Sequence, residues 1–135
     1  MKIQFLGAAQ EVTGSKHLIT TESGKTILLD CGMYQGKGME TDAANRELGF
    51  DPKDIHYLLL SHAHIDHSGL IPYIYSRGFR GKIYCTAATR DLCQLMLQDT
   101  AFIQEQDVRW YNKKMDRQHK PKIKPLFDMN HAQQV

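Results

Sequence analysis

The segment Ser61–Gly69, with the sequence SHAHIDHSG, constrains this chain more than any other feature. It holds three histidines and one aspartate, and it directly follows the apolar run Tyr57–Leu60. A neutral imidazole and an ionised carboxylate are both ready to bind a metal near neutral pH. The apolar run predicts a strand over residues 55–61, so the cluster is expected on a loop at a strand end, where side chains can converge. We therefore predict a metal site there.

The spacing inside the cluster favours two adjacent metals. His62 and His64 are two residues apart, so they point the same way in an extended segment. Asp66 and His67 follow where the chain turns into a helix predicted to begin near Ser68. One metal would be bound by the first pair and the other by the second pair. Mixed nitrogen and oxygen ligands favour zinc, with manganese and iron as alternatives.

Composition describes an ordinary globular domain with no strong charge bias. The chain has 135 residues, of which 41% are hydrophobic and 24% charged, and its net charge is +2. No apolar stretch is long enough to span a bilayer, and the first residues do not resemble a signal peptide. The three cysteines, Cys31, Cys85 and Cys93, lack the CxxC spacing of a zinc site. We expect them to be reduced thiols in a cytoplasmic protein that does not enter a membrane.

Periodicity and turn residues predict a chain of alternating strands and helices, an α/β (α+β) protein. The run Thr26–Asp30 is continuously apolar up to its last residue, so we expect a strand buried on both faces. Thr86 or Thr89 is expected to cap a long helix that continues past Trp110, and Asp128 is expected to cap another. The predicted strands cover residues 2–7, 15–21, 26–30, 55–61 and 82–85; the predicted helices cover 39–48, about 68–78, 86 to beyond 110, and 129–135.

The cluster is short of ligands for two metals. A catalytic zinc has three or more protein ligands and an open position for water, whereas the cluster offers two ligands to each metal. The other histidines, His17, His56, His119 and His131, have no evident reason to reach it. The site is therefore expected to be incomplete within these residues.

The segment His62–His67 matches the HxHxDH signature of the metallo-β-lactamase superfamily. Further segments resemble its β-CASP branch, the RNA-processing nucleases related to the pre-mRNA 3′-end cleavage factor. This resemblance covers most of the chain, from residue 3 to about 106. The segments that carry it are Phe5–Ser15, Leu28–Gly36, Ser61–Pro72, Ala87–Leu92 and Leu97–Glu105.

The resemblance implies a role for each matching residue. His62 and His64 would bind the first zinc, and Asp66 and His67 the second. Asp66 would also be catalytic, by orienting the bridging hydroxide. Asp30 would be an outer carboxylate that positions the ligand loop. The implied chemistry is two-metal hydrolysis of RNA phosphodiesters, as an endonuclease, a 5′-exonuclease or both.

In this family further histidines and a bridging aspartate complete the metal centre, and no residue in 107–135 matches their motifs. We therefore expect the chain to be the N-terminal part of a larger enzyme, with the first half of the αββα sandwich. Residues 1–118 would belong to the metallo-β-lactamase domain, and residues 119–135 would form a connector and the start of a helix. By itself it is expected to bind zinc weakly or not at all, to be inactive, and to self-associate through uncovered apolar surface.

Two alternatives remain open at this point. The HxHxDH motif also fits a thioesterase-like or lactonase-like hydrolase on the same scaffold. The missing ligands and the basic stretch Lys113–Lys124, close to Trp110 and Tyr111, fit a non-catalytic module that binds RNA or protein. A solvated helix end is the simpler interpretation of that stretch, because Asp107 and Asp116 interrupt it.

Overall fold

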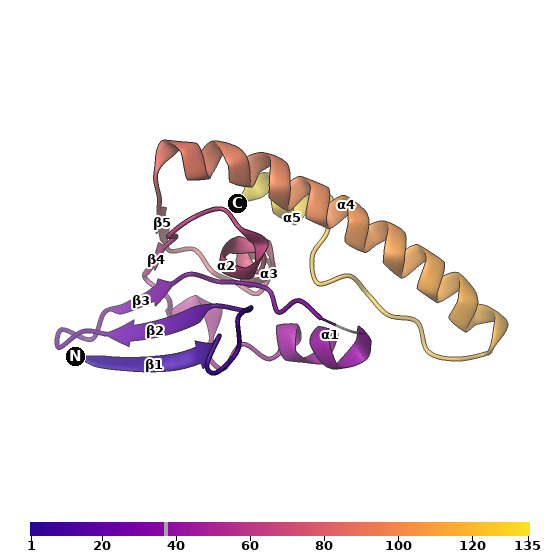
Figure 1. Cartoon of the computed structure of the whole chain (residues 1–135), viewed down its shortest axis with the longest axis horizontal. Helices are drawn as coiled ribbons and strands as arrows, with labels where there is room; N and C mark the ends of the chain where they lie inside the picture. Colours follow the sequence, from indigo (N-terminus) through magenta and orange to yellow (C-terminus); the bar gives the residue numbers. More distant parts are fainter. Residues whose placement is uncertain (37) are drawn as a thin grey trace.

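The computed structural model describes residues 1–36 and 38–135, and it is a mixed α/β structure (Figure 1). The elements in chain order are β1 (Lys2–Gly7), β2 (Lys16–Thr20), β3 (Thr26–Leu29), α1 (Gly38–Arg46), the short 3-10 helix η1 (Pro52–Asp54), β4 (Tyr57–Leu59), α2 (Ile65–Ser68), α3 (Ile71–Ser76), β5 (Lys82–Tyr84), α4 (Ala87–Arg117) and α5 (Met129–Gln134). All five predicted strands are present, most of them in slightly shorter form.

The strands form a single sheet in the order β1-β2-β3-β4-β5. β1 pairs antiparallel with β2 and β2 pairs antiparallel with β3, and the turn Glu22–Lys25 joins β2 to β3. β4 and β5 are each parallel to the preceding strand. A parallel connection needs a crossover, which the segment containing α1 and the segment containing α2 and α3 supply.

One face of the sheet is packed against helices. Leu18, Leu28 and Leu58 lie side by side across β2, β3 and β4 and are buried. They belong to one apolar core together with residues of α3 and α4, among them Ile74 and Leu97. Figure 1 shows α2 and α3 between the sheet and α4. Burial of these leucines provides the main driving force for this layer, at about 25 cal/mol per Å² of apolar surface.

The opposite face of the sheet is apolar and much more exposed. A row of aligned positions carries Phe5 (68% exposed), Leu59 (39%) and Tyr84 (51%). The prediction that Thr26–Asp30 forms a strand buried on both faces was therefore wrong. The strand is β3, and only its Leu28 is fully buried, because no described element covers the side chains that point the other way.

The long helix α4 begins as predicted, with the Thr86 side chain accepting a hydrogen bond from Thr89 N. Its first half packs on the core, and its second half extends beyond the sheet and α1 (Figure 1). Asn112 bonds Ile123 on the returning connector through both of its amide atoms, at 2.8 and 2.7 Å. Asp128 caps α5, also as predicted. None of the described helices is long and apolar enough to cross a membrane.

Candidate metal centre

The predicted ligand cluster lies at the carboxyl end of β4, where the chain turns directly into α2. His62 and His64 are in the loop, and α2 starts at Ile65 rather than near Ser68. The earlier start arises because His64 O accepts hydrogen bonds from the backbone N–H groups of His67 and Ser68, both at 2.9 Å. The Ser68 hydroxyl also donates to Ala63 O at 2.8 Å. Asp66 and His67 are thereby held in the first turn of a helix.

The structure brings the four predicted ligands together. The ring centroids of His62 and His64 are 4.8 Å apart, and those of His62 and His67 are 4.1 Å apart. His67 Nε2 lies 3.6 Å from an Asp66 carboxylate oxygen, and both side chains remain about one-quarter exposed. The ligand atoms therefore form one patch that is open to solvent on one side.

Asp30 lies under this patch and is almost completely buried, with 4% exposure. It follows β3 in a left-handed conformation with φ of 59°, which aspartate tolerates better than most residues. Its carboxylate accepts hydrogen bonds from Ser61 N at 2.8 Å, from Ser61 Oγ at 2.9 Å and from His67 Nδ1 at 2.8 Å. The carboxylate thus contacts both ends of the ligand loop.

These hydrogen bonds fix which ring nitrogen of His62 and of His67 carries the proton. The Ser61 hydroxyl gives its single proton to Asp30, so it must accept from His62 Nδ1, which lies 2.9 Å away. His67 Nδ1 donates directly to Asp30. In the neutral rings the lone pairs are therefore on Nε2 of both histidines. Histidines that bind a metal usually donate their other ring N–H to a carboxylate or to another fixed acceptor, as both of these histidines do.

Backbone hydrogen bonds hold the helical turn against the segments before β2 and after β3. Asp66 O accepts from Ser15 N at 2.9 Å, and His67 O accepts from Cys31 N at 2.8 Å. Beside these donors, Gly32 lies so close to Asp66 that a Cβ on it would overlap the Asp66 carbonyl group. Only glycine fits there, which explains its place in the segment after β3.

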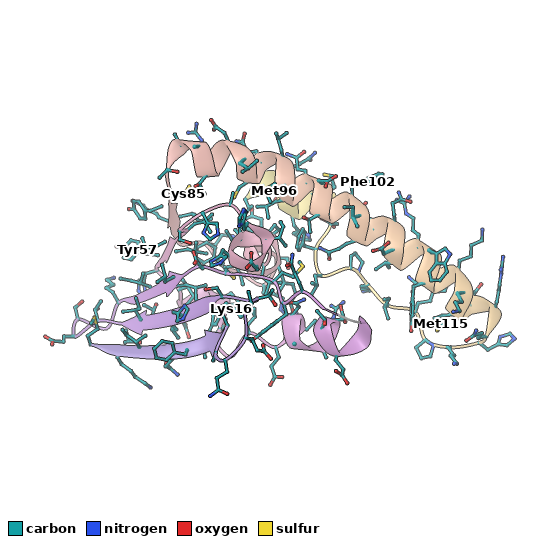
Figure 2. The ribbon with its side chains drawn as sticks, viewed as in Figure 1. Lys16, Tyr57, Cys85, Met96, Phe102 and Met115 are labelled. Carbon is teal, nitrogen blue, oxygen red and sulfur yellow. The ribbon has the colours of Figure 1, made fainter. Side chains whose placement is uncertain are left out.

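Sequence reasoning missed Lys16, which is fully buried beside these segments (Figure 2). Its Nζ donates to Gly14 O at 3.0 Å and to Gly32 O at 3.1 Å, and it lies 4.4 Å from the centre of the Tyr34 ring. Burial lowers the pKa of Lys16. The one signal in the sequence is that Lys16 alternates with the core residue Leu18 along β2, which places both on the buried face.

The remaining candidate donors lie elsewhere or are not ligand-competent. Burial raises the pKa of Cys31 to about 12, so its thiol stays protonated. His17 packs on Phe5, and His131 bonds Asp128 at the start of α5. Within residues 1–36 and 38–135, no three histidine, cysteine, aspartate or glutamate side chains are arranged to hold one metal ion together. The four residues of the patch fit metal ions in donor type, and in His62 and His67 the hydrogen bonds leave Nε2 with the lone pair that a metal ion needs.

Comparison with known proteins identifies the family. Residues 13–127 match the metallo-beta-lactamase superfamily. The chain belongs to this superfamily. Its members usually bind metal ions, commonly zinc. A metallo-beta-lactamase of Cronobacter sakazakii with a mutated HARLDQ motif superposes with a TM-score of 0.51 and 25% identity, over 68% of this chain and 34% of that one. The expected fold class is confirmed.

Relatives in sequence include RNA nucleases and a termination factor, which confirms the β-CASP resemblance. Ribonuclease TTHA0252 of Thermus thermophilus is 44% identical over 78% of this chain. Transcription termination factor FttA of Methanothermobacter thermautotrophicus is 35% identical over 73%, and endoribonuclease ysh1 of Aspergillus fumigatus is 38% identical over 70%. The chain spans only 24%, 16% and 11% of their respective lengths.

Proposed function

We propose that this chain supplies the first half of a two-zinc centre that hydrolyses RNA phosphodiester bonds. His62 and His64 would hold one ion, and Asp66 and His67 the other. The observation that carries the proposal is the hydrogen-bond chain from Asp30 through Ser61 to His62 and directly to His67, which leaves both Nε2 lone pairs free. The names of the relatives support RNA as the substrate class.

In this proposal the residues around the ligands orient the site and do not transfer protons. Asp30 sets the tautomer of the two imidazoles and so leaves their Nε2 atoms without a proton, and the donors Ser15 N and Cys31 N hold the helical turn in place. Asp66 would orient the attacking water. Zinc, when bound, supplies the Lewis acidity that makes water a nucleophile near neutral pH and neutralises charge on the phosphodiester.

The remaining ligands of such a centre would lie outside residues 1–135. Two ligands per ion give weak and labile binding, so these residues alone should hold zinc partly or not at all and should not cleave RNA. The domain division is part of the proposal, with residues 1–118 in the metallo-β-lactamase domain and 119–135 leading to its remainder. The proposal also includes a reducing, cytoplasmic location, which the three free cysteines support. Self-association, which the uncovered apolar surface led us to expect, has no support in the comparisons.

Zinc titration by calorimetry of an enzyme that contains these residues with a full ligand set tests the ligand assignment. Asp66→Asn and His62→Ala should each weaken zinc binding at least tenfold, because each removes a ligand to one ion. His119→Asn is the matched control, since His119 is an exposed histidine on the distant connector. Tight, stoichiometric zinc that is equally strong in the three variants would contradict the assignment.

The reaction itself is tested in an enzyme that contains these residues with a full ligand set. Asp66→Asn there should abolish cleavage of single-stranded RNA without unfolding the protein. Retained cleavage with normal zinc content would contradict a catalytic role for Asp66. Turnover of a glutathione thioester in place of RNA would favour the thioesterase interpretation.

A further inference from the structure

The outer face of α4 carries a stripe of basic and aromatic side chains, far along the chain from the metal cluster. Arg109, Lys113 and Arg117 are spaced four residues apart, and so are Trp110 and Lys114. Residues four apart lie on the same face of a helix, so these five form one stripe, and all five are exposed. We call this the arm stripe. The opposite side of the helix carries the buried Met115 (Figure 2).

Charge is distributed very unevenly between this region and the rest of the chain. Residues 107–124 contain seven lysines and arginines and two aspartates, a net charge of +5. The whole chain carries +2, so the other residues together carry −3. Such an asymmetry produces a positive field at one end of the molecule, which favours an anionic partner there.

The two aspartates do not cancel the stripe. By helical geometry Asp107 and Asp116 lie at its two borders, not within it. Asp116 faces Lys122 of the connector at 3.8 Å, which offsets its charge locally. The arm stripe itself therefore presents four cationic side chains with no acidic side chain between them.

Trp110 gives the stripe a second property that a merely solvated helix end does not need. Its side chain is 68% exposed, although tryptophan is usually buried over most of its surface. Lys114 Nζ lies 5.5 Å from the ring centre, close enough for a cation–π contact. Phe102, two turns earlier on the same side, is 53% exposed (Figure 2). An exposed aromatic ring among cations is the combination with which proteins bind single-stranded nucleic acid, through base stacking and phosphate contacts.

We propose that the arm stripe is a docking surface for single-stranded RNA, separate from the metal cluster. Arg109, Lys113, Lys114 and Arg117 contact phosphates, and a base stacks on Trp110. The choice of RNA over another polyanion rests on the proposed function. The surface would hold a substrate strand on the part of α4 that extends away from the sheet (Figure 1).

The 135-residue chain has a single tryptophan, so its fluorescence reports this surface alone. Titration with a short oligouridylate at low ionic strength should quench Trp110, and fluorescence anisotropy of a labelled oligouridylate should give the same affinity. Trp110→Ala should weaken binding about 5- to 150-fold, the range expected for loss of one stacked base. Trp110→Tyr keeps a stacking ring and should stay close to the wild-type affinity.

The triple variant Lys113→Ala/Lys114→Ala/Arg117→Ala tests the phosphate contacts while keeping good helix formers. The slope of log K against log salt should become shallower by about 2, since each phosphate contact to a single strand contributes about 0.7. The matched control Lys2→Ala/Lys25→Ala/Lys82→Ala removes the same charge from exposed positions on the sheet and its β2–β3 turn, and it should leave the slope nearly unchanged.

Equal losses in the two triple variants, or RNA binding without Trp110 quenching, would overturn the inference. So would preferential binding of vesicles rich in phosphatidylserine. Zinc affinity measured on the arm variants keeps the two proposals apart. If Asp66→Asn does not change zinc binding but the arm variants lose RNA affinity, only the metal assignment is wrong. If Asp66→Asn weakens zinc binding but the arm variants keep their RNA affinity, only the docking surface is wrong.

Discussion

Replacement of Asp30 tests whether one buried carboxylate holds the metal cluster together. Asp30→Ala removes the acceptor for Ser61 N, Ser61 Oγ and His67 Nδ1. The Ser61 hydroxyl can turn to water because Ser61 is exposed, but Ser61 N and His67 Nδ1 lose a partner under a site that is closed on that side.

The expected cost follows from these contacts. A buried donor left without an acceptor costs about 1–3 kcal/mol, so two of them cost about 2–6 kcal/mol. Alanine at the φ of 59° that Asp30 adopts adds roughly 1 kcal/mol, because its Cβ is strained there and it lacks the local hydrogen bonds of aspartate. The sum is a large part of the roughly 5–15 kcal/mol by which a domain is typically stable. We expect the variant to be largely unfolded or to unfold at a much lower urea concentration.

Asp30→Asn separates the effect on the histidines from the effect on stability. Asparagine tolerates the same φ, and its carbonyl oxygen can still accept from Ser61 N. Its NH₂ group, however, faces His67 Nδ1, which must then become an acceptor, so the ring proton moves to Nε2. We expect a loss of only about 1–2 kcal/mol in the free energy of unfolding, but a loss of zinc affinity of roughly 10- to 100-fold.

Urea unfolding followed by circular dichroism, together with zinc calorimetry, measures both quantities. Asp30→Gly removes the backbone strain of the alanine variant and should recover roughly 1 kcal/mol. Asp99→Asn is the matched control, an exposed aspartate on α4 that should change neither measurement. An Asp30→Ala chain with the wild-type midpoint, or an Asp30→Asn chain with wild-type zinc affinity, would refute the reasoning.

Three further substitutions probe the segments that pack on the helical turn, and Gly24→Ala in the β2–β3 turn serves as a comparison for one of them. Gly32→Ala should cost more than about 3 kcal/mol in urea unfolding, or prevent folding, because its Cβ would overlap the backbone of the ligand turn. Gly24→Ala should cost about 1 kcal/mol, because a Cβ at Gly24 meets open space and only the φ of 78° is unfavourable. Because burial raises the pKa of Cys31 to about 12, the native state keeps a proton that the unfolded chain loses above 9.0. The contribution of Cys31 to stability should fall by up to about 1.4 kcal/mol per pH unit above that value, so Cys31→Ala should gain stability relative to the wild type as pH rises there. Lys16→Met should cost about 2–6 kcal/mol because two buried carbonyl groups lose their donor. Because the pKa of Lys16 is lowered, the contribution of Lys16 to stability should grow as pH rises toward 10.5, so the deficit of Lys16→Met relative to the wild type should widen with pH.

Local signals explain which parts of the fold could be predicted from the sequence. The helix caps Thr86 and Asp128 act within three residues of themselves, so the starts of α4 and α5 were readable from the chain alone. The start of α2 at Ile65 was not, because it depends on the His64 carbonyl accepting from two backbone donors in a loop of metal-ligand residues. Lys16 was missed because a lysine normally keeps its ammonium in water.

The candidate site could also be predicted only in part, and the reason differs from the reason that applies to the fold. The ligand residues lie within six consecutive positions, so the motif reveals them together. The hydrogen bonds that set their protonation join Asp30 to residues 31 and 37 positions later, and no local pattern encodes such a contact. A resemblance to a family pointed to Asp30, but the relay through Ser61 to His62 emerges only from the folded arrangement.

The core of the sheet and the metal cluster are linked through the register of two strands. β3 and β4 pair in parallel with Leu28 opposite Leu58 and Leu29 opposite Leu59, and this register brings Asp30 N to Leu59 O at 2.9 Å. A slip of one residue would turn Leu28 or Leu58, both fully buried, toward the uncovered face of the sheet. The same slip would carry the Asp30 carboxylate away from Ser61. Burial of two leucines therefore selects the one register in which the carboxylate reaches the histidines, and the free energy of the core stabilises the geometry of the site.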